Sequence, residues 1–514
     1  MTTRVRLIAI VILGVAMATW VALWPHLGAV DAWWRWAPPA ERSNSGQIWS
    51  AIALFTSPVV VYTMAAFAAI WAARRRLFAA SASIVLTSVL TASITQVMKE
   101  LVHRPRADSP WAYLLSQTGW SFPSGHVSAW TAVAVAVVTL SRVAGQSKRM
   151  VWAWRGVALG SVAVVMVCRL TLHAHYVTDV IGGALLALLV ATSSNLLCGV
   201  HAFGGRRGDG ARRAGVIFNP AKIVDLTVFK QLLETALAEN GWGPPIYLPT
   251  SPDDPGHAMA RHAVRIGVDR VLIAGGDGTV RVALGELAGT GVEAAIIPSG
   301  TANLLAQNLG IPFDLSRSLR LALRGEPRPL DLIKVTSPER RGFVEYAGVL
   351  AGIGADAAVI SNTNEELKRQ IGTAAYVVAA LNQVKTHPMD VLITVDDEHP
   401  IRRAASLVSV GNVADLQPGL TLIPGASTSD GILDLLIASP RNVGDVVEMI
   451  GGVLTQSKNE PRIDRFTGRT VHVETAEPAL CQIDGDVVGE FRHLDFHIVP
   501  GAVPLAQPKE SSQA

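Results

Sequence analysis

Chemically reactive side chains gather in three short segments between residues 99 and 179. The central segment, Trp-Ser-Phe-Pro-Ser-Gly-His at 120–126, places a glycine turn and a histidine at the start of an apolar run. The two flanking segments add cations, a second histidine and a carboxylate. The six groups are Lys99, Arg106, His126, Arg169, His175 and Asp179. Together they predict a site that binds and cleaves a phosphate ester.

Each group has a task in that chemistry. Arginine holds phosphate oxygens through its two-pronged guanidinium, and lysine acts as a point charge. Backbone N–H groups around Ser124 and Gly125, at a helix start, would add an anion-binding turn. A neutral imidazole can attack phosphorus to give a phosphohistidine, and a carboxylate four residues away on one helical face, as Asp179 is from His175, would orient the ring. His126 would protonate the leaving alkoxide, and this chemistry needs no metal.

Six apolar runs predict that these groups are held by a membrane bundle. Half of the 514 residues are apolar and only 17% are charged, and the apolar runs are concentrated before residue 200. A spanning helix needs about 20 apolar residues. The runs cover about 5–25, 48–72, 78–98, 126–142, 150–168 and 179–200. We therefore predict an all-α, six-helix transmembrane domain at 1–200, whose first run is retained because it lacks a small-residue cleavage site.

Positive residues between the runs predict the orientation. They cluster before the first run and after the second, fourth and sixth runs, at Arg4 and Arg6, at Arg74–Arg76, at Arg142, Lys148 and Arg149, and at Arg206, Arg207, Arg212 and Arg213. The positive-inside rule then places the N-terminus in the cytoplasm of a plasma-membrane protein. The six reactive groups fall at the outer ends of the third to sixth spans. The cations of the 99–106 loop oppose the rule, and phosphate binding gives them a reason to be there.

These motifs resemble a known family. Lys99-x6-Arg106, Pro-Ser-Gly-His at 123–126 and Arg169-x5-His175-x3-Asp179 are similar to the three signatures of the type 2 phosphatidic acid phosphatases. The resemblance implies that His175 is the nucleophile, His126 the acid and base, and Asp179 the orienting carboxylate. It also implies a phosphate clamp of Lys99, Arg106 and Arg169. Two positions depart from the family pattern, Ala107 where proline is usual and Cys168 where serine is usual, and the second removes a hydrogen bond to phosphate.

The pattern of the chain changes after residue 200. A Gly- and Arg-rich linker at 201–213 leads into alternating strands and helices at 214–330, which predict a parallel α/β lobe. Short alternating strands at 331–505 predict a second, β-rich lobe with one helical stretch near 364–385, and 506–514 is a predicted disordered tail. The fold class is thus multidomain, an all-α membrane bundle followed by a two-lobed soluble part.

A second candidate site lies in the α/β lobe. Gly275, Gly276 and Gly278 follow an apolar strand and open a helix, where backbone can approach a phosphate closely. Another glycine turn follows the next strand at 299–303. No Gly-Lys-Ser/Thr triplet follows Gly278, so this is not a Walker A loop.

The soluble half resembles the diacylglycerol kinase catalytic family. The resemblance rests on Asn-Pro at 219–220, Gly-Gly-Asp-Gly-Thr at 275–279, Pro-Ser-Gly-Thr-Ala-Asn at 298–303, Gly354-x-Asp356-Ala357, Asp430-Gly-x-x-Asp434 and Asp484-Gly-Asp486. It implies that ATP is surrounded by Asn219, Thr250, Gly275, Gly276, Asp277, Gly278, Thr279 and Thr301. It implies that Asp277 also serves a magnesium–phosphate centre, that Asp430 with Ser427 forms a magnesium position, and that Asp486 is the base. The family usually has a longer glutamate at the last position, and a hydroxyl and glycine where this chain has Ala221-Lys222.

These inferences predict a bifunctional membrane lipid enzyme, a phosphatidate-type phosphatase fused to an ATP- and Mg²⁺-dependent diacylglycerol-type kinase. Two alternatives stay open. One pairs a polyprenyl (pyro)phosphate phosphatase with a sphingoid or other lipid kinase, and the other makes the soluble half a nucleotide-binding regulator. A net charge of +3 gives no support for a nucleic-acid partner, and three scattered cysteines predict no disulfide framework.

Overall fold

The computed structural model describes residues 3–509 apart from 24–25, 33–36, 41, 112–118, 147, 201–211, 355–387, 397, 418–419, 422, 424, 441–444 and 446–461. The chain forms two compact units. One holds Met1–Arg206 together with Val224–Glu239 and Asp314–Ser316, and the other holds the rest of the chain. Most of the predicted linker, the helical stretch expected near 364–385 and the motif residues Asp356 and Ala357 lie outside the described residues.

Apolar helices build the first unit, as predicted. Five are long and apolar enough to span a membrane, namely α1 (Thr3–Leu23), α5 (Phe78–Val102), α6 (Gly125–Val143), α7 (Lys148–Thr171) and α8 (Val177–Leu197). The expected second span is two helices, α3 (Asn44–Phe55) and α4 (Pro58–Arg74), bent by 46°. Pro58 explains the break, because its ring and missing N–H prevent a helix from continuing through it. The bent pair raises the number of candidate spans in the described chain to six.

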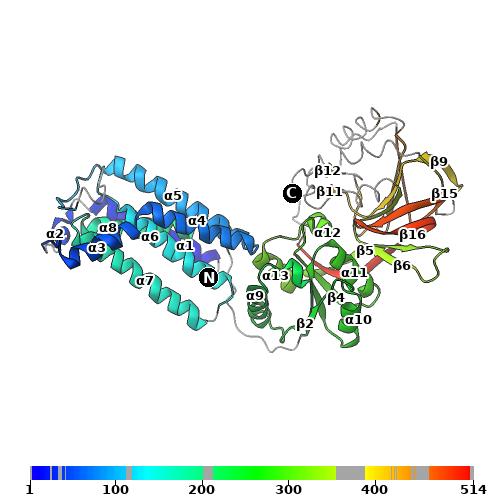
Figure 1. The fold of residues 1–514 in the computed structure, drawn as a ribbon, viewed down its shortest axis with the longest axis horizontal. Coiled ribbons are helices and arrows are strands. Elements are labelled where there is room, and N and C mark those ends of the chain that lie inside the picture. The colour runs from blue at the N-terminus through cyan, green and yellow to red at the C-terminus, as the bar shows by residue number, and fades with distance from the viewer. Residues whose placement is uncertain are drawn as a thin grey trace. The chain divides into compact units, whose positions relative to one another are not determined.

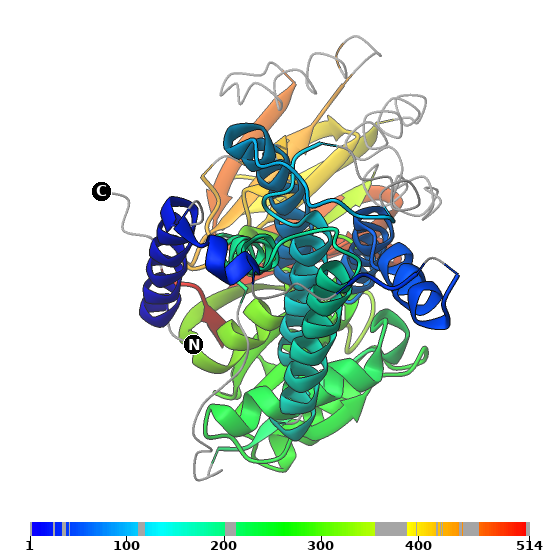
Figure 2. The ribbon, with the colours of Figure 1, turned by 90° about the vertical axis from the view of Figure 1, so that its left-hand side faces the viewer.

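The packing of α5 directs its single cation, Lys99, toward the neighbouring helices. Ser83, Thr87, Thr91 and Thr95 recur every four residues along α5 and all are buried. Residues at this spacing share one helical face, and small hydroxyl side chains allow helices to approach closely. Lys99 continues the same face. Helix α6 packs against α4, α5, α7 and α8 (Figures 1 and 2), so Lys99 lies among the central helices of the unit.

The second half begins as the predicted α/β lobe. Its elements are β1 (Ala214–Phe218), η2 (Pro220–Lys222), α9 (Leu226–Glu239), β2 (Ile246–Pro249), α10 (His257–Arg265), β3 (Arg270–Gly275), α11 (Asp277–Leu287), β4 (Glu293–Pro298), α12 (Leu304–Asn308) and α13 (Leu315–Arg324). The strands run parallel in the order β4-β3-β1-β2. Parallel strands put all their carboxyl ends at one sheet edge, where both glycine turns lie.

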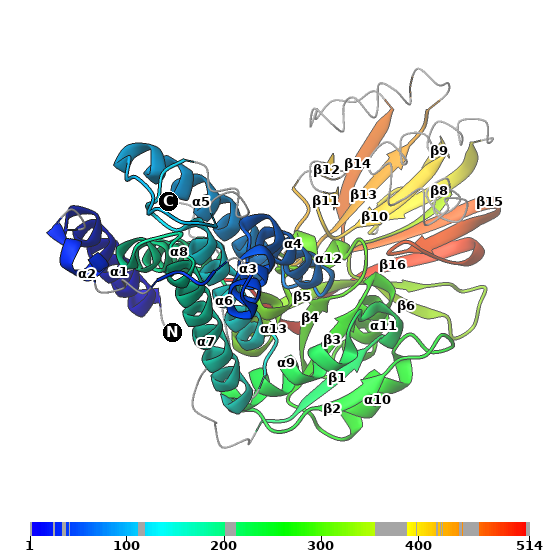
Figure 3. The same cartoon turned by 60° about the vertical axis from the view of Figure 1, so that its left-hand side comes forward.

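The β-rich part is antiparallel apart from one contact. Its described strands are β5 (Glu326–Thr336), β6 (Val344–Ala347), β7 (Leu350–Gly354), β8 (Met389–Val395), β9 (Ile401–Ala405), β10 (Leu407–Gly411), β11 (Asp415–Gln417), β12 (Leu420–Thr421), β13 (Leu433–Ala438), β14 (Ile463–Gly468), β15 (Thr470–Ile483) and β16 (Asp486–Gln507). Strand β16 pairs with β15 and β5, and near its end Leu505 pairs in parallel with Ala294 of β4. The two predicted lobes therefore share one continuous sheet (Figure 3).

The last strand corrects one predicted boundary. Ala506 is buried and pairs with Pro327, and Gln507 pairs with Glu326. The predicted disordered tail at 506–514 was therefore wrong at its first residues, because β16 pairs with β5 as far as Gln507 and this long-range pairing leaves no signal in the polar composition of the segment.

Candidate active sites

The reactive groups of the membrane unit meet at one end of the helix bundle. Lys99 lies in the last turn of α5 and Arg169 in the last turn of α7, whereas His126 and Asp179 lie in the first turns of α6 and α8. His175 lies in the loop between α7 and α8. Successive helices run in opposite directions, so the ends of odd-numbered helices and the starts of even-numbered ones coincide here. Residues far apart in sequence thus form one cluster.

His175 is held by a carboxylate on one side and faces a cation on the other. Its Nδ1 lies 3.3 Å from Asp179 Oδ2, and its Nε2 lies 3.5 Å from Arg106 Nη1. A proton on Nδ1 satisfies the carboxylate and leaves the Nε2 lone pair directed toward Arg106. Burial lowers the pKa of His175 to about 4, although Asp179 opposes the shift. The ring is therefore neutral at pH 7, as a nucleophile must be.

Arg169 is a buried cation with unused donors. It is 1% exposed, and its Nε and Nη1 atoms have no hydrogen-bond partner among the described residues. Ser124 Oγ is also buried without a partner in this part of the chain. Leaving such groups unpaired is costly, so both call for an anion. His126 lies within electrostatic range of Lys99, Arg169 and His175, which completes the cluster.

One predicted contact changes its form. The Ser124 N–H, which we expected to face an anion, donates to the Asp179 carbonyl at 3.1 Å. A Cβ added to Gly183 of α8 would lie 2.7 Å from the Ser124 carbonyl. Helix α8 therefore lies close enough to the turn for its backbone to accept the Ser124 N–H. Ser124 can therefore offer an anion its hydroxyl but not its backbone N–H.

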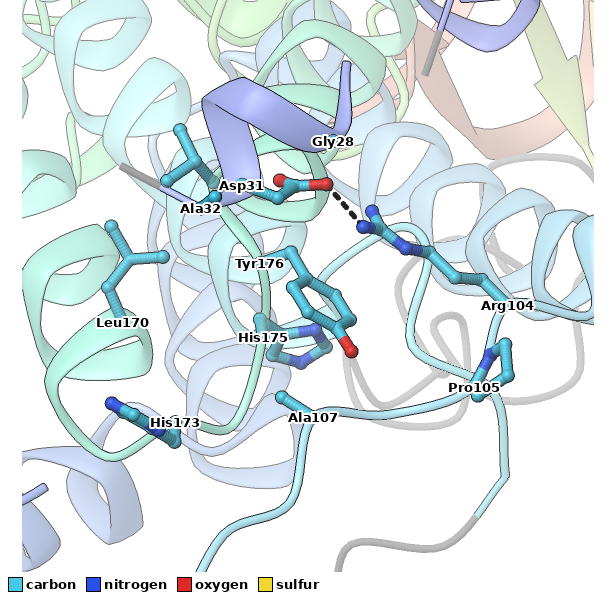
Figure 4. A pocket seen from close by; sticks show the side chains of 11 residues that line it. Gly28, Asp31, Ala32, Arg104, Pro105, Ala107, Leu170, His173, His175 and Tyr176 are labelled. Carbon is cyan, nitrogen blue, oxygen red and sulfur yellow. Dashed lines mark hydrogen bonds and ion pairs between the residues drawn. The ribbon is translucent and has the colours of Figure 1, made fainter. Parts of the chain in front are cut away.

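A pocket of about 540 Å³ opens beside His175 (Figure 4). Its wall includes His173, Tyr176 and Ala107, and also Asp31 and Arg104. Cys168, the second departure from the family pattern, points elsewhere. Its Sγ donates to the Trp49 carbonyl at 3.3 Å and packs with Ala53, so this position contributes to helix packing in this chain.

The second site is built from two glycine turns that touch. A Cβ on Gly300 would lie 2.5 Å from Gly276 Cα, and a Cβ on Gly275 would lie 2.6 Å from Thr279 Cβ. Only glycine allows this approach, which leaves bare backbone at the carboxyl ends of β3 and β4. Thr250 Oγ1, just after β2 at the same edge of the sheet, is buried with no partner in the described chain. Asn219 Oδ1 accepts from the Ala221 N–H at 3.0 Å, so the unusual Ala221-Lys222 pair still forms a capped turn.

Asp277 joins the two turns. Its Oδ2 accepts from the Asn303 N–H at 2.9 Å and its Oδ1 from the Leu304 N–H at 2.6 Å. Burial raises the pKa of Asp277, and these N–H groups oppose the rise. The role that the structure displays for Asp277 is to fix the start of α12 beside the first turn. Thr301, also expected near ATP, lies exposed in the second turn.

Asp486 is positioned by an arginine that the sequence did not single out. Arg281 Nη2 lies 3.2 Å from Asp486 Oδ2, and its Nη1 lies 2.7 Å from Glu345 Oε2. The turn before Asp486 is anchored by Asp484, which accepts the N–H groups of residues 348–350 at 2.8–2.9 Å. Asp486 lies beside Gly278, since a Cβ there would be 3.2 Å from its Oδ2. The carboxylate therefore reaches the first glycine turn even without the extra methylene of glutamate.

The proposed metal residues lie on the turn before β13. Asp430 Oδ1 accepts from the Ile432 N–H at 3.1 Å, and Ser427 Oγ accepts from the Ser429 N–H at 3.4 Å. Burial and the charge of Asp430 raise the pKa of Asp434 to about 6. Two carboxylates that repel each other suit a hard cation such as Mg²⁺. The described residues contain no cluster of three or more His, Cys, Asp or Glu side chains placed to hold a metal.

The helix-end cluster and the paired glycine turns define two classes of domain, a membrane phosphatase type and a two-lobed lipid kinase type. Family models agree with both. The PAP2 superfamily matches residues 76–198, the diacylglycerol kinase catalytic domain matches 213–335, and the YegS C-terminal NAD kinase beta sandwich-like domain matches 348–507. Through its C-terminal half the chain belongs to the YegS-like lipid kinase family, and residues 76–198 of its N-terminal half match the PAP2 superfamily model. Membership of these families supports phosphatase and lipid kinase activities.

Curated relatives match the C-terminal half. The chain is 30% identical to the "Probable lipid kinase YegS-like" of Klebsiella pneumoniae (strain 342), over 48% of this chain and 81% of that protein. It is 28% identical to the diacylglycerol kinase of Mycobacterium tuberculosis (strain ATCC 25618 / H37Rv), over 50% and 82% of the two chains. It is also 28% identical to an uncharacterized protein of Synechocystis sp., over 47% of this chain and only 55% of that one. A solved structure from Bacillus anthracis str. Sterne shares the two-lobed fold at 23% identity, covering 58% of this chain and 96% of the other with a TM-score of 0.50.

Proposed function

We propose that the bundle end hydrolyses a phosphatidate-type lipid phosphate through a phosphohistidine. The observation that carries this proposal is the buried Arg169, whose Nε and Nη1 lack partners among the described residues and which lies within electrostatic range of His175. A phosphate dianion would satisfy these donors together with Lys99 and Arg106. Ser124 would add its hydroxyl.

The reaction then takes two steps. His175 Nε2 forms a bond to phosphorus while the bond from phosphorus to the lipid oxygen breaks, and His126 gives its proton to the leaving alkoxide. Neutral His126 next takes a proton from water, whose oxygen attacks phosphorus as the P–N bond breaks. Inorganic phosphate and a lipid alcohol leave, and both histidines return to their starting states. Asp179 holds the Nδ1 proton of His175 throughout.

We propose that the second site transfers the terminal phosphoryl group of ATP to a lipid alcohol such as diacylglycerol. The contact of Gly276 with Gly300 carries this proposal, because it leaves a cradle of bare backbone at the helix start where phosphates bind. The lipid hydroxyl gives its proton to Asp486, its oxygen bonds to the phosphorus, and the bond to ADP breaks. Bound Mg²⁺, for which Asp430, Asp434 and Ser427 offer oxygen ligands, supplies charge neutralisation.

We further propose that the two reactions occur on opposite sides of a plasma membrane. The phosphatase cluster lies where α6 and α8 begin, whereas the chain leaves the bundle toward the kinase from the far end of α8 at Leu197. The positive clusters favour a cytoplasmic position for that far end, and ATP is available there. Separate leaflets would keep the kinase product away from the phosphatase.

A lipid panel tests these proposals on the purified full-length protein in vesicles. Mass spectrometry should find phosphatidate converted to diacylglycerol without ATP, and diacylglycerol converted to phosphatidate with ATP and Mg²⁺. His175→Ala should abolish only the first reaction and Asp486→Asn only the second, so each variant is the control for the other. Preferential turnover of polyprenyl (pyro)phosphates or sphingoid bases would favour the alternative substrates. ATP binding without phosphorylation of any lipid would make the second half a regulator.

A further inference from the structure

The carboxylate that orients His175 is itself held by a chain of buried charges. Asp179 is fully buried, and its Oδ2 accepts from Ser121 Oγ and from the Tyr176 N–H at 3.0 Å in addition to facing His175. Its Oδ1 accepts from Arg104 Nη1 at 2.7 Å. Arg104 thus fixes one oxygen so that the other points at His175.

Arg104 is shared with a second carboxylate, Asp31, as the dashed line in Figure 4 shows. The side chains of Arg104 and Asp31 are 8% and 9% exposed, and the guanidinium stacks over the Tyr176 ring with its carbon 4.0 Å from the ring centroid. Arg104 Nη1 also donates to Thr178 Oγ1 at 2.5 Å. Planar stacking and forked pairing hold a guanidinium in one orientation, which lysine cannot reproduce.

Asp31 comes from outside the segment that matches the phosphatase family. It lies on the short helix α2 (Gly28–Ala32), in the loop between α1 and α3. It accepts from the Thr178 N–H at 3.0 Å and from Thr178 Oγ1 at 2.9 Å, and so also caps the start of α8. Both Asp31 and Arg104 line the pocket beside His175. The first loop of the bundle therefore reaches the catalytic carboxylate through one arginine.

We propose that Asp31 and Arg104 are positioning residues of the phosphatase, which act through Asp179 on the orientation of His175. This inference rests on the proposed phosphatase function. Both terminal nitrogens of Arg104 are engaged by Asp179, Thr178 and Asp31, so removal of the pair should slow the chemical step and leave phosphate binding intact. A small misplacement of a catalytic group can lower a rate by about 100-fold.

The test uses steady-state phosphatase kinetics of the full-length protein in vesicles, with inorganic phosphate as a product inhibitor. Asp31→Asn should lower kcat about 10-fold and Arg104→Gln about 100-fold, whereas KM and the inhibition constant of phosphate change less than about 2-fold. The double variant should be no slower than Arg104→Gln alone, because both residues act in one chain. Arg104→Lys should not restore kcat. The thermal unfolding midpoint of each preparation verifies that the bundle is folded, and ATP-dependent lipid phosphorylation normalises the rates for the amount of active protein.

Val30→Ala provides the matched control. Val30 neighbours Asp31 on α2 and packs against the core formed by Val127, Val165 and Leu170, so its truncation loosens α2 without removing a charge. It should change kcat by less than about 2-fold. The proposal is overturned if folded Asp31→Asn keeps its kcat, if Val30→Ala is equally slow, or if the inhibition constant rises along with the loss of kcat. A different result would contradict the phosphohistidine mechanism itself: the wild type hydrolyses lipid phosphates, and His175→Ala hydrolyses them at the same rate.

Discussion

Under the proposed functions, the phosphatase cluster would recognise phosphate with side chains, whereas the kinase turns would recognise it with backbone. At the bundle end, the donors belong to Lys99, Arg106 and Arg169, of which Arg169 is fully buried and the other two are partly buried. In the kinase lobe, Gly276 and Gly300 bring bare backbone together at the ends of parallel strands. At the start of α6 the Ser124 N–H is already taken by the Asp179 carbonyl, so the phosphatase site relies on charged side chains. A sheet edge has free N–H groups at helix starts and needs only glycine to expose them.

The comparison also separates two ways of holding a catalytic carboxylate. Asp179 is fully buried and is surrounded by four donors from three segments, whereas Asp486 is half exposed and is held chiefly by Arg281. A carboxylate that must orient a ring is fixed in place. Asp486, the proposed base that would take a proton from a lipid hydroxyl, remains accessible at a turn.

Removing a side-chain cation should have the largest effect and should affect one site only. We expect Arg169→Met to lower phosphatase kcat/KM by about 1000-fold, because it deletes two donors aimed at the phosphate in a dry site. Kinase activity should not change. Arg155→Met on the same helix, which removes an arginine stacked on Trp152, is the matched control and should stay within about 2-fold of wild type. Arg169→Met with more than a tenth of wild-type activity would contradict the proposed clamp.

Adding one methyl group at a backbone site should have a large but smaller effect. Gly300→Ala forces the two turns apart, because its Cβ would meet Gly276 Cα at 2.5 Å. We expect ATP-dependent lipid phosphorylation to fall about 100-fold while phosphatase activity is retained. Gly215→Ala in β1, whose Cβ would meet neighbours at an ordinary 3.5 Å, should leave both activities unchanged. Equal losses of kinase activity in the two variants would mean that the loss in Gly300→Ala comes from disturbed sheet packing and not from the separation of the two turns.

The pH dependence of the phosphatase should reflect the low pKa of His175. Because the pKa of His175 is lowered to about 4, its imidazole stays neutral from high pH down to that value. After correction for the second ionisation of the lipid phosphate at about pH 6, phosphatase kcat/KM should therefore lose activity on the acid side near pH 4 and not near 6.5, where an ordinary histidine titrates. A pH–rate profile between pH 3.5 and 8 measures the midpoint, with protein stability checked at each pH. An acid midpoint near 6.5 would show that the ring is more hydrated than its burial indicates.

The smallest effect is expected at Cys168. Serine is usual at this family position, and the sequence suggested that its loss would weaken phosphate binding. The thiol instead donates to the Trp49 carbonyl inside the bundle. Cys168→Ser should therefore change phosphatase kcat/KM by less than about 2-fold, as measured with the same vesicle assay. An increase of 10-fold or more would show that the side chain can turn toward the phosphate.

Several features followed from sequence patterns because local chemistry fixes them. Apolar runs of about 20 residues permit few structures other than spanning helices, and strand–helix alternation permits few other than a parallel sheet. The phosphatase and kinase families were identified from motifs, and both identifications are confirmed. The three cations, two histidines and one carboxylate at 99–179 also lie at one end of the bundle, as the positions of the apolar runs predicted. The helix break at Pro58 was missed, although the proline itself was a visible signal.

Other features depended on contacts that no local pattern encodes. Asp31 is linked to Asp179 through Arg104 only because α2 packs against the start of α8. Nothing in the sequence of the segment 28–32 marks it as part of a site. Arg281 meets Asp486, 205 residues further along, only because β16 returns to the α/β lobe. The Ser124 N–H is used up because α8 comes close enough to bind it. Sequence determined which groups could do chemistry, since that depends on side-chain type and spacing. Tertiary structure alone decided which partners hold them, since a buried charge or N–H must pair with whatever the packing brings within reach.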